Sequence, residues 1–372
     1  MKKGGFMRIL HITDRMHAGS GISQLLLSYS KKLVNEGIYF DYLVERCDDS
    51  VKDIISLLGG EVYIMPKLGF RTIKDFCCFL RDFFRKCEFK IVHSHYYQID
   101  IFAMHYAYKS GVSHYISHSH NPSYSDYALR SIRNWILSLP IRVMATDFCA
   151  CSQESGEFLF GKHLLRLRGK KLYVLPNAID YSKFYFNKQL RKDVRERFNI
   201  KEELVIGIVG SLRPQKNQGF LVKVLKFIHD NYDQNIRLIM VGDGVSRCNL
   251  ENLIGNNGLV DNVIITGFTD RSWEYYNAFD CYVLPSVYEG FGLSLLEAQV
   301  NSLRCVCSSV IPDDPIISNH VIKLHLTDNI ETWAKTIYDS AIQGRSSEVF
   351  SDRYNVESQS EKLTTYYKNM IK

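Results

Sequence analysis

Strand-like and helix-like segments alternate along almost the whole chain, and they do so in two successive series. The first series has short apolar runs with amphipathic helical patterns between them. Its expected strands are Met7–Thr13, Phe40–Glu45, Glu61–Met65, Ile91–Ser94, Tyr115–His118, Phe148–Cys151 and Leu172–Leu175. Such alternation is typical of a parallel sheet wrapped by helices, so the sequence predicts the α/β class.

The second series repeats this arrangement from Leu204 onward. Its expected strands are Leu204–Gly210, Arg237–Val241, Val263–Thr266, Cys281–Leu284 and Arg304–Ser308. Two series in 372 residues predict two doubly wound, Rossmann-like domains with a cleft between them. We expect residues 1–183 to form the first domain and 184–353 the second, with the linker near Ile179–Lys188. Residues 354–372 have a helical pattern with no following strand, and we expect this helix to return to the first domain.

Composition and charge limit the classes of function that the protein can have. The content of 46% hydrophobic and 23% charged residues is that of a folded soluble protein, and ten cysteines without zinc-knuckle spacing indicate a reduced, cytoplasmic protein. Residues 1–185 hold 25 lysines and arginines against 17 acids, whereas residues 186–372 hold 21 against 23. No arginine-rich run supports nucleic-acid binding. The basic first half suits peripheral contact with the anionic inner face of the plasma membrane, or a phosphate-bearing acceptor, better than it suits nucleic acid, and a solvated basic surface with no partner is an equal alternative. Neither a signal peptide nor a membrane-spanning run is predicted.

The segment PSVYEGFGLSLLEA, residues 285–298, has the spacing of a chemical site. Gly290 and Gly292 free the backbone to bend just before an expected helix, while Glu289 lies on the loop and Glu297 about one turn inside the helix. A helix N-terminus beside bare glycines binds anions, because unpaired N–H groups converge there. A nucleotide sugar, with phosphates in its middle and hydroxyls at both ends, fits this pattern.

Other loops at the same sheet edge carry polar or glycine-rich turns. Arg213 and Lys216 follow the strand Leu204–Gly210 and are placed to hold a diphosphate; an ordinary exposed loop is the alternative. Gly242 and Gly267-Phe268 follow the next two strands, and each taken alone indicates only a tight turn.

Taken in order, GSLRPQKN, VGDG, GLVDNVIITGFTDR and AFDCYVLPSVYEGFGLSLLEA resemble the nucleotide-sugar-binding half of the retaining glycosyltransferases of family four, the glycosyl transferases group 1, which have the GT-B fold. The likeness covers nearly the whole chain. It implies that Glu289 faces the donor sugar, that Glu297 accepts hydrogen bonds from the ribose and that Lys216 contacts the diphosphate. The amides that meet the diphosphate would be those of Gly290, Phe291, Gly292 and Leu293.

The resemblance departs from the family at one basic position. The family's usual arginine falls at Ser211, and Arg213, two residues further on, is the candidate to replace it. In the first half, Gly19-Ser20-Gly21 resembles the family's Gly-Gly turn that approaches the donor phosphate. Its spacing is not that of a dinucleotide fingerprint, and a plain strand-to-helix turn is the alternative.

Four histidines form two His-x-His pairs, His93 with His95 and His118 with His120. Alternate residues on a strand share a face, so each pair is able to chelate a metal. No carboxylate or cysteine is near in sequence, however, and the family's transfer uses no metal, so we predict no metal and no cofactor. The segment YISHSHNPS resembles instead the family's strand ending in a histidine that contacts the donor sugar. His120, next to Asn121, is the first candidate and His118 the second.

The function implied is a retaining transferase that moves a sugar from a nucleoside diphosphate, expected to be UDP, to a saccharide hydroxyl. The segments SGISQLLLSYSKKL and RCVCSS resemble bacterial exopolysaccharide, capsule and O-antigen transferases, which implies an acceptor linked to a polyprenyl diphosphate. Two alternatives remain open at this point: a sugar-nucleotide epimerase of related fold, and a non-catalytic partner in a polysaccharide assembly complex.

Overall fold

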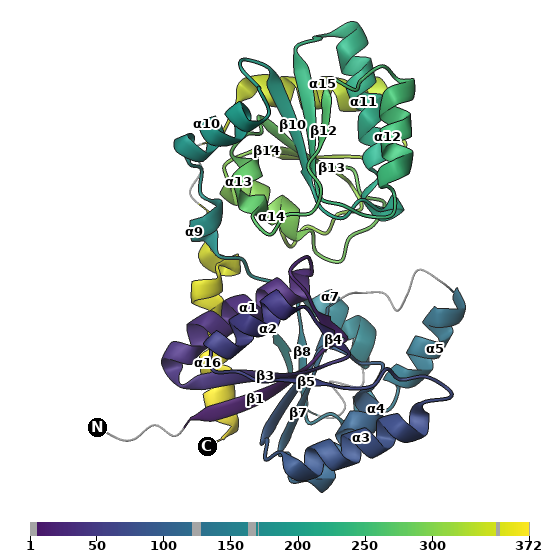
Figure 1. The fold of residues 1–372 in the computed structure, drawn as a ribbon, viewed down its shortest axis with the longest axis vertical. Coiled ribbons are helices and arrows are strands. Elements are labelled where there is room, and N and C mark those ends of the chain that lie inside the picture. The colour runs from purple at the N-terminus through teal and green to yellow at the C-terminus, as the bar shows by residue number, and fades with distance from the viewer. Residues whose placement is uncertain (1–5, 121–127, 163–168, 170, 347–349, 372) are drawn as a thin grey trace. The chain divides into compact units, whose positions relative to one another are not determined.

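Two parallel sheets organise the chain in the computed structural model (Figure 1). The structure describes residues 6–120, 128–162, 169, 171–346 and 350–371. Unit 1 comprises Met1–Ala178 and Arg353–Lys372, and unit 2 comprises Ile179–Asp352. Each unit is described by itself.

Unit 1 is built on a sheet of seven parallel strands in the order β5-β3-β1-β6-β7-β8-β9. The strands are β1 (Met7–Ile12), β3 (Ile38–Val44), β5 (Val62–Ile64), β6 (Ile91–Ser94), β7 (His114–Ser119), β8 (Asp147–Ala150) and β9 (Leu172–Val174). The short strands β2 (Arg15–Met16) and β4 (Arg46–Cys47) pair beside it. Apolar side chains of the central strands are fully buried on both faces, as a sheet covered on two sides requires.

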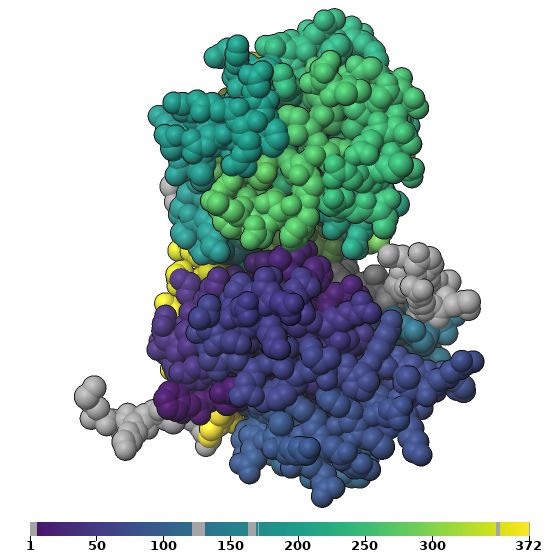
Figure 2. Space-filling model, viewed as in Figure 1, coloured from purple at the N-terminus to yellow at the C-terminus, as the bar shows by residue number. Residues whose placement is uncertain are grey.

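The helices of unit 1 cover both faces of this sheet. They are α1 (Gly21–Leu33), α2 (Asp49–Leu57), α3 (Ile73–Lys86), α4 (Asp100–Lys109), α5 (Ala128–Ser138), α6 (Ile141–Met144), α7 (Gln153–Gly156) and α16 (Val356–Met370). Short turns of other helix types follow α1, at Val34–Glu36, and α7, at Glu157–Gly161. Purple and blue atoms of the first part of the chain form the visible face of unit 1 in Figure 2. One apolar cluster packs α1, α2 and α16 against the sheet and another packs α3 and α4 against it, so the sheet lies inside the unit.

Helix α16 packs against α1 and shares its apolar core, since Val356, Leu363 and Tyr367 are buried among side chains of α1 and β3. Ion pairs join its ends to the same region, between Lys32 and Glu357 and between Glu36 and Lys368. The last helix thus returns to the first domain, as the sequence predicts.

Unit 2 has a sheet of six parallel strands in the order β12-β11-β10-β13-β14-β15. The strands are β10 (Leu204–Val209), β11 (Ile236–Val241), β12 (Val263–Ile265), β13 (Cys281–Leu284), β14 (Arg304–Ser308) and β15 (Val321–Leu324). The helices are α9 (Tyr181–Phe184), α10 (Lys188–Arg197), α11 (Gln218–Asn231), α12 (Arg247–Asn256), α13 (Ser272–Tyr276), α14 (Leu293–Val300) and α15 (Ile330–Gln343). A 3-10 turn spans Pro214–Lys216.

One prediction about the connection between domains is corrected by the structure. The segment Ile179–Lys188, expected to be a linker, already belongs to unit 2 and contains α9. Its side chains Tyr181 and Phe184 are buried, which ties the segment into that unit. Among the described residues no helix has the length and apolar character needed to cross a bilayer.

Candidate functional site

In the sheet of unit 2, the order in which the chain adds strands reverses between β10 and β13. The chain runs outward from β10 to β11 and β12, then returns to β13 on the other side of β10. Loops that follow two strands at such a reversal diverge and leave room for a ligand at the carboxyl edge of the sheet. The two loops here are residues 210–217 and 285–292, which hold most of the polar residues that the sequence singles out.

Hydrogen bonds fasten these two loops to each other. The backbone N–H of Val287 donates to the carbonyl of Gln215 at 2.8 Å, and the Gln215 side-chain amide donates to the carbonyl of Tyr288 at 3.0 Å. The side-chain amide of Asn217 donates to the carbonyl of Pro285 at 3.1 Å. Both loops are therefore held in a fixed position, as a preorganised site requires.

Lys216 and Glu289 meet where the loops are joined. The Lys216 ammonium lies 2.5 Å from Oε1 of Glu289, and the hydroxyl of Ser286 donates to the same oxygen at 2.8 Å. Only 16% of the Lys216 side chain and 8% of the Glu289 side chain are exposed. Screening by water is weak at such a site, so each charge depends on the other. The structure thus brings together two residues that are 73 positions apart.

Glu297, the second glutamate, lies in α14 and is bound by a tyrosine that the sequence analysis did not single out. The hydroxyl of Tyr276 donates to Oε2 of Glu297 at 2.5 Å. Burial raises the pKa of Glu297 to about 7, and the Tyr276 hydrogen bond and the charge of Lys216 offset only part of that rise. Glu297 is therefore close to the point of losing its proton at neutral pH, where a new hydrogen-bond donor would favour the charged form.

The turn between the glutamates leads directly into α14. Gly292 has φ of +91°, a left-handed conformation that a side chain disfavours, and Leu293 begins the helix. Phe291 is buried, while Gly290 is partly exposed. The unpaired N–H groups at the start of α14 therefore lie at the end of the loop that carries Glu289, the partner of Lys216.

Glycines at the ends of β10 and β11 allow two backbones to touch. A Cβ atom at Gly242 would lie 2.2 Å from the carbonyl oxygen of Gly210, and Gly242 has φ of +140°. Gly242 also forms an antiparallel bridge with Gly267, whereas the neighbouring Phe268 is 60% exposed. The turns that the sequence marks at Gly242 and Gly267 are thus joined at one sheet edge.

Ser211 and Arg213 occupy different environments in the loop after β10. Ser211 is partly buried, and its carbonyl accepts a hydrogen bond from the Gln218 side chain at 3.0 Å. Arg213 is exposed and makes no ion pair with any residue that the structure describes. Its guanidinium is therefore free to contact an anion.

In unit 1, Gly19, Ser20 and Gly21 form the turn that opens α1. The Ser20 hydroxyl caps the helix by accepting from the N–H of Ser23 at 3.3 Å, and Ser23 in turn accepts from the N–H of His17. Helix α1 therefore begins directly after Ser20, at Gly21.

His118 and His120 belong to a cluster of five histidines at the centre of the unit 1 sheet. The others are His93 and His95, the second His-x-His pair, and His11, which no sequence pattern connects to them. The parallel register places His11 opposite His93, so residues 82 positions apart become neighbours. The residues after His120 in the YISHSHNPS segment, Asn121 included, lie outside the described residues.

Hydrogen bonds arrange these rings in two rows. In one row the Tyr367 hydroxyl lies 2.6 Å from Nδ1 of His93, and Nε2 of His93 lies 3.0 Å from Nδ1 of His118. In the other row His11 Nδ1 lies 3.0 Å from His95 Nε2, and His95 Nδ1 lies 2.8 Å from His120 Nε2. Burial lowers the pKa of His120 to about 4 and that of His11 to about 3. The cluster is therefore uncharged at neutral pH.

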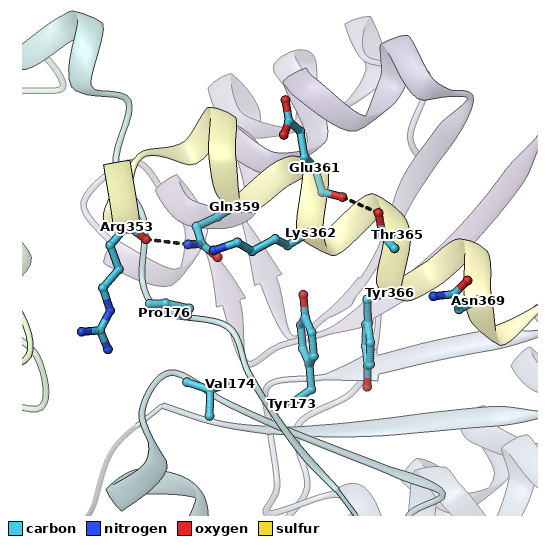
Figure 3. A pocket seen from close by; sticks show the side chains of 10 residues that line it. All are labelled: Tyr173, Val174, Pro176, Arg353, Gln359, Glu361, Lys362, Thr365, Tyr366 and Asn369. Carbon is cyan, nitrogen blue, oxygen red and sulfur yellow. Dashed lines mark hydrogen bonds between the residues drawn. The ribbon is translucent and has the colours of Figure 1, made fainter. Parts of the chain in front are cut away.

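Unit 1 also has a surface hollow of about 700 Å³ between β9 and α16 (Figure 3). The stacked rings of Tyr173 and Tyr366, 4.0 Å apart, stand on one side of it. None of the residues predicted to act in the function line this hollow. It is therefore separate from the candidate site.

The two doubly wound units define the class as an α/β protein of the GT-B fold. A sequence model of the family described as "Glycosyl transferases group 1" matches residues 191–362. The chain is 30% identical over 356 residues to a putative glycosyltransferase, EpsF, of Bacillus subtilis, covering 92% of this chain and 90% of that protein. The chain therefore belongs to the family of glycosyl transferases group 1.

Other relatives support this assignment. The UDP-Gal:alpha-D-GlcNAc-diphosphoundecaprenol alpha-1,3-galactosyltransferase of Escherichia coli is 24% identical over 393 residues, covering 98% of this chain and 97% of that protein. The crystal structure of HepE from Anabaena in complex with UDP-glucose superposes with a TM-score of 0.78 at 15% identity, over 98% of this chain and 100% of that chain. This likeness confirms the GT-B fold that the sequence predicts.

Proposed function

We propose that this protein transfers a sugar from a nucleoside-diphosphate sugar, with a UDP-sugar as the first candidate, to a hydroxyl of a saccharide acceptor with retention of configuration. The observation that carries the proposal is the contact between Lys216 and Glu289, at the switch point of unit 2 and beside the start of α14. A cation and a helix N-terminus suit a diphosphate, and a carboxylate beside them suits sugar hydroxyls.

The proposed chemistry needs charge stabilisation more than a side-chain nucleophile. As the bond from the sugar to the diphosphate breaks, negative charge grows on the leaving phosphate and positive charge on the sugar ring. Lys216, Arg213 and the amides around Gly292 would stabilise the phosphate, and Glu289 would orient the sugar. The leaving phosphate would itself accept the acceptor's proton. In this scheme no metal is required, since the cationic side chains take its place.

Glu297 would hold the ribose of the donor. Its carboxylate accepts one hydrogen bond from Tyr276 and retains lone pairs for two hydroxyls. On the side of unit 1, His120 or His118 would contact the donor sugar, with the turn Gly19-Ser20-Gly21 close to the donor phosphate. These assignments follow the family resemblance residue by residue.

For the acceptor we propose a saccharide linked to a polyprenyl diphosphate, in bacterial surface-polysaccharide biosynthesis. The E. coli relative is named for a diphosphoundecaprenol-linked substrate, and a Staphylococcus aureus relative, 23% identical over 344 residues, is named for capsular polysaccharide biosynthesis. An acceptor with such a lipid would bring the enzyme to the surface of the membrane.

Helix α5 and the start of α6 provide a surface suited to that contact. Ile132, Trp135, Ile136, Leu139 and Val143 follow helical spacing, yet each is between 36% and 59% exposed. Asn134 and Ser138, on the opposite side of α5, are buried. The helix thus turns its apolar side outward, next to the exposed Arg133. A helix of this kind lies in the interface of an anionic membrane with its apolar side in the lipid.

The proposal is tested by incubating the protein with a panel of UDP-, GDP- and ADP-sugars and measuring its thermal stability, followed by a transfer assay on a lipid-linked saccharide. We expect one donor to raise the melting temperature and to be consumed only when acceptor is present. Consumption of the donor without acceptor, giving an isomeric nucleotide sugar, would indicate an epimerase instead. A protein that binds none of the donors would be a non-catalytic partner.

A further inference from the structure

The five-histidine cluster of unit 1 has more ring nitrogens than its own hydrogen bonds use. Nε2 of His11, Nε2 of His118 and Nδ1 of His120 are buried and have no hydrogen-bond partner among the residues that the structure describes. A buried polar atom without a partner is unfavourable, and in a native protein a water molecule, an ion or another group completes its bonding.

The number of protons on the rings determines which nitrogens have a free lone pair that a metal ion can bind. Each neutral imidazole carries one proton, so the row His11–His95–His120 has three protons for two hydrogen bonds. One end of the row therefore keeps an unused N–H and the other end a bare lone pair. The row Tyr367–His93–His118 obeys the same count. One choice of tautomers places both lone pairs on β7 and the residue after it, at His118 Nε2 and His120 Nδ1.

The open nitrogen of His118 belongs to a ring that a hydrogen bond already orients, because the other ring nitrogen of His118 is bonded to His93, which is not one of the ligands. Metal-binding histidines show this pattern, because a hydrogen bond to the second nitrogen fixes the tautomer and the orientation of the ring.

The spacing is also suitable. One ligand atom from each of His95, His118 and His120 lies within 4.8 Å of the others. A tetrahedral ion about 2.1 Å from each nitrogen needs about 3.4 Å between nitrogens, so closure requires shifts of no more than about 1.4 Å. With His120 Nδ1 bare, the lone pair of His95 is on Nδ1, so His95 would exchange its hydrogen bond to His120 for the ion and keep the one to His11. His95 and His120 are each partly exposed, whereas the open nitrogens of His118 and His120 are buried.

We propose that His95, His118 and His120 form a binding site for a divalent transition-metal ion of the zinc class. Imidazole is a preferred ligand of Zn²⁺ and Co²⁺, and neutral imidazole is the form that binds. The metal would occupy the histidines that the proposed function assigns to the donor sugar. It would therefore act as an inhibitor and not as a cofactor.

A second group of residues in unit 1 could bind the same metal ion, and the experiment must distinguish it from the proposed site. The sequence shows no cysteine near the histidines, but strand pairing places Cys149 opposite His118, and Cys149 forms a second possible ligand set with His93 and His118. That set is fully buried and would add a sulfur ligand. The nature of the ligand atoms therefore distinguishes the two sites.

The whole protein, freed of metal with a chelator, would be titrated with Co²⁺ and followed by visible absorption and calorimetry, with Zn²⁺ as competitor and with no donor present. We expect saturation at one ion per chain, with the intense visible bands of a tetrahedral ion. His118→Gln and His120→Gln should each weaken binding about tenfold or more. His105→Gln is the matched control, because His105 is exposed on α4 outside the cluster and its loss should change nothing.

X-ray absorption of the zinc-loaded wild-type protein supplies a readout that does not depend on variants that fold. Three imidazole nitrogens without sulfur would support the site, whereas a sulfur ligand would reject it in favour of the Cys149 set. Binding that is not saturable, or that His105→Gln weakens as much as His118→Gln does, would overturn the proposal. None of these measurements depends on sugar transfer. The metal site can therefore be disproved without affecting the proposed function, and the reverse also holds.

Discussion

The ammonium group of Lys216 lies 2.5 Å from the carboxylate of Glu289, and both side chains are mostly buried in loops that hydrogen bonds hold together. The pair is therefore a fixed element of unit 2 that is already formed without a ligand. A donor that bound here would meet the lysine through its phosphate and the glutamate through its sugar.

Replacing either member of this pair should abolish most of the activity. We expect Lys216→Ala and Glu289→Ala to lower kcat/KM about 100-fold or more, because a charge that stabilises the transition state is lost. The protein should stay folded by circular dichroism. Lys223→Ala is the control, since Lys223 is exposed on α11 away from these loops. Wild-type-like transfer by either variant of the pair would contradict the site assignment.

The same pair should show coupling in stability. Lys216→Met and Glu289→Gln each leave a partly buried group without its charged partner, whereas the double variant Lys216→Met/Glu289→Gln removes both charges. We expect the double variant to lose less free energy of unfolding than the two single variants together. Denaturant unfolding of all four proteins measures the coupling, and simple additivity would show that the two groups act independently.

Glu297 should make the stability of the protein depend on pH. The folded protein holds this proton up to about pH 7, whereas the unfolded chain releases it near the ordinary value of 4.5. The folded state binds more protons between these values, so the contribution of Glu297 to stability falls as pH rises through this window. We expect Glu297→Gln to remove this fall, which amounts to at most about 3 kcal/mol. Unfolding curves from pH 5 to pH 8 measure it.

Donor affinity should change with pH in the opposite direction. A ribose hydroxyl donates to Glu297 best when the carboxylate is ionised, so the donor should bind more weakly as the pH falls below about 7. Calorimetric titration of the donor at several pH values tests this prediction. In Glu297→Gln the affinity should be low and nearly independent of pH; an unchanged profile in that variant would assign the titration to another group.

The outward-facing apolar side of α5 should bind anionic membranes. We expect the double variant Trp135→Ser/Ile136→Ser to lose most of the binding to vesicles that contain phosphatidylglycerol, and added salt to weaken the wild-type interaction. Val245→Ser is the control, since Val245 is 86% exposed in unit 2. Cosedimentation measures binding. If the double variant sediments like the wild type, α5 is not the contact surface.

Gly242 should tolerate no side chain. A Cβ at this position would lie 2.2 Å from the Gly210 carbonyl oxygen, and φ is +140°. Gly242→Ala should therefore destabilise the protein by about 1–3 kcal/mol. Gly219→Ala is the matched change, because its Cβ would meet only ordinary contacts at 3.5 Å in α11, and it should be neutral or slightly stabilising. Equal effects of the two changes in thermal unfolding would rule out the close approach of the two backbones.

Most strands were predictable from the sequence because each is a short apolar run between turn residues, and the expected Ile91–Ser94 and Cys281–Leu284 agree with the structure residue for residue. The edge strand β15 and the two-residue strands β2 and β4 were not predicted. Helix α10 was not, since its sequence KQLRKDVRER has no apolar stripe. Tertiary contacts hold it instead: Arg191 binds Asp280 at 2.6 Å, and Arg195 donates to the carbonyls of Lys201 and Glu203. A pattern of local hydrophobicity cannot detect such contacts.

The candidate site was also predictable only where its residues lie close together in the sequence. The glutamates and Lys216 were found because their spacing follows one loop and one helix, whereas Tyr276, the partner of Glu297, lies 21 residues away on α13. His11 and Cys149 could not be predicted as neighbours of the other histidines for a similar reason. Both reach the histidines through strand pairing, which the order of the sequence does not reveal.

The return of α16 to unit 1 sets an order on folding during synthesis. Tyr367, fully buried and bonded to His93, leaves the ribosome only after all 174 residues of unit 2, Ile179–Asp352. At about 5–20 residues per second this takes roughly ten to forty seconds, during which the apolar surface that α16 covers on α1 and β3 is open. The second unit is therefore synthesised in full before the last helix of the first unit can dock.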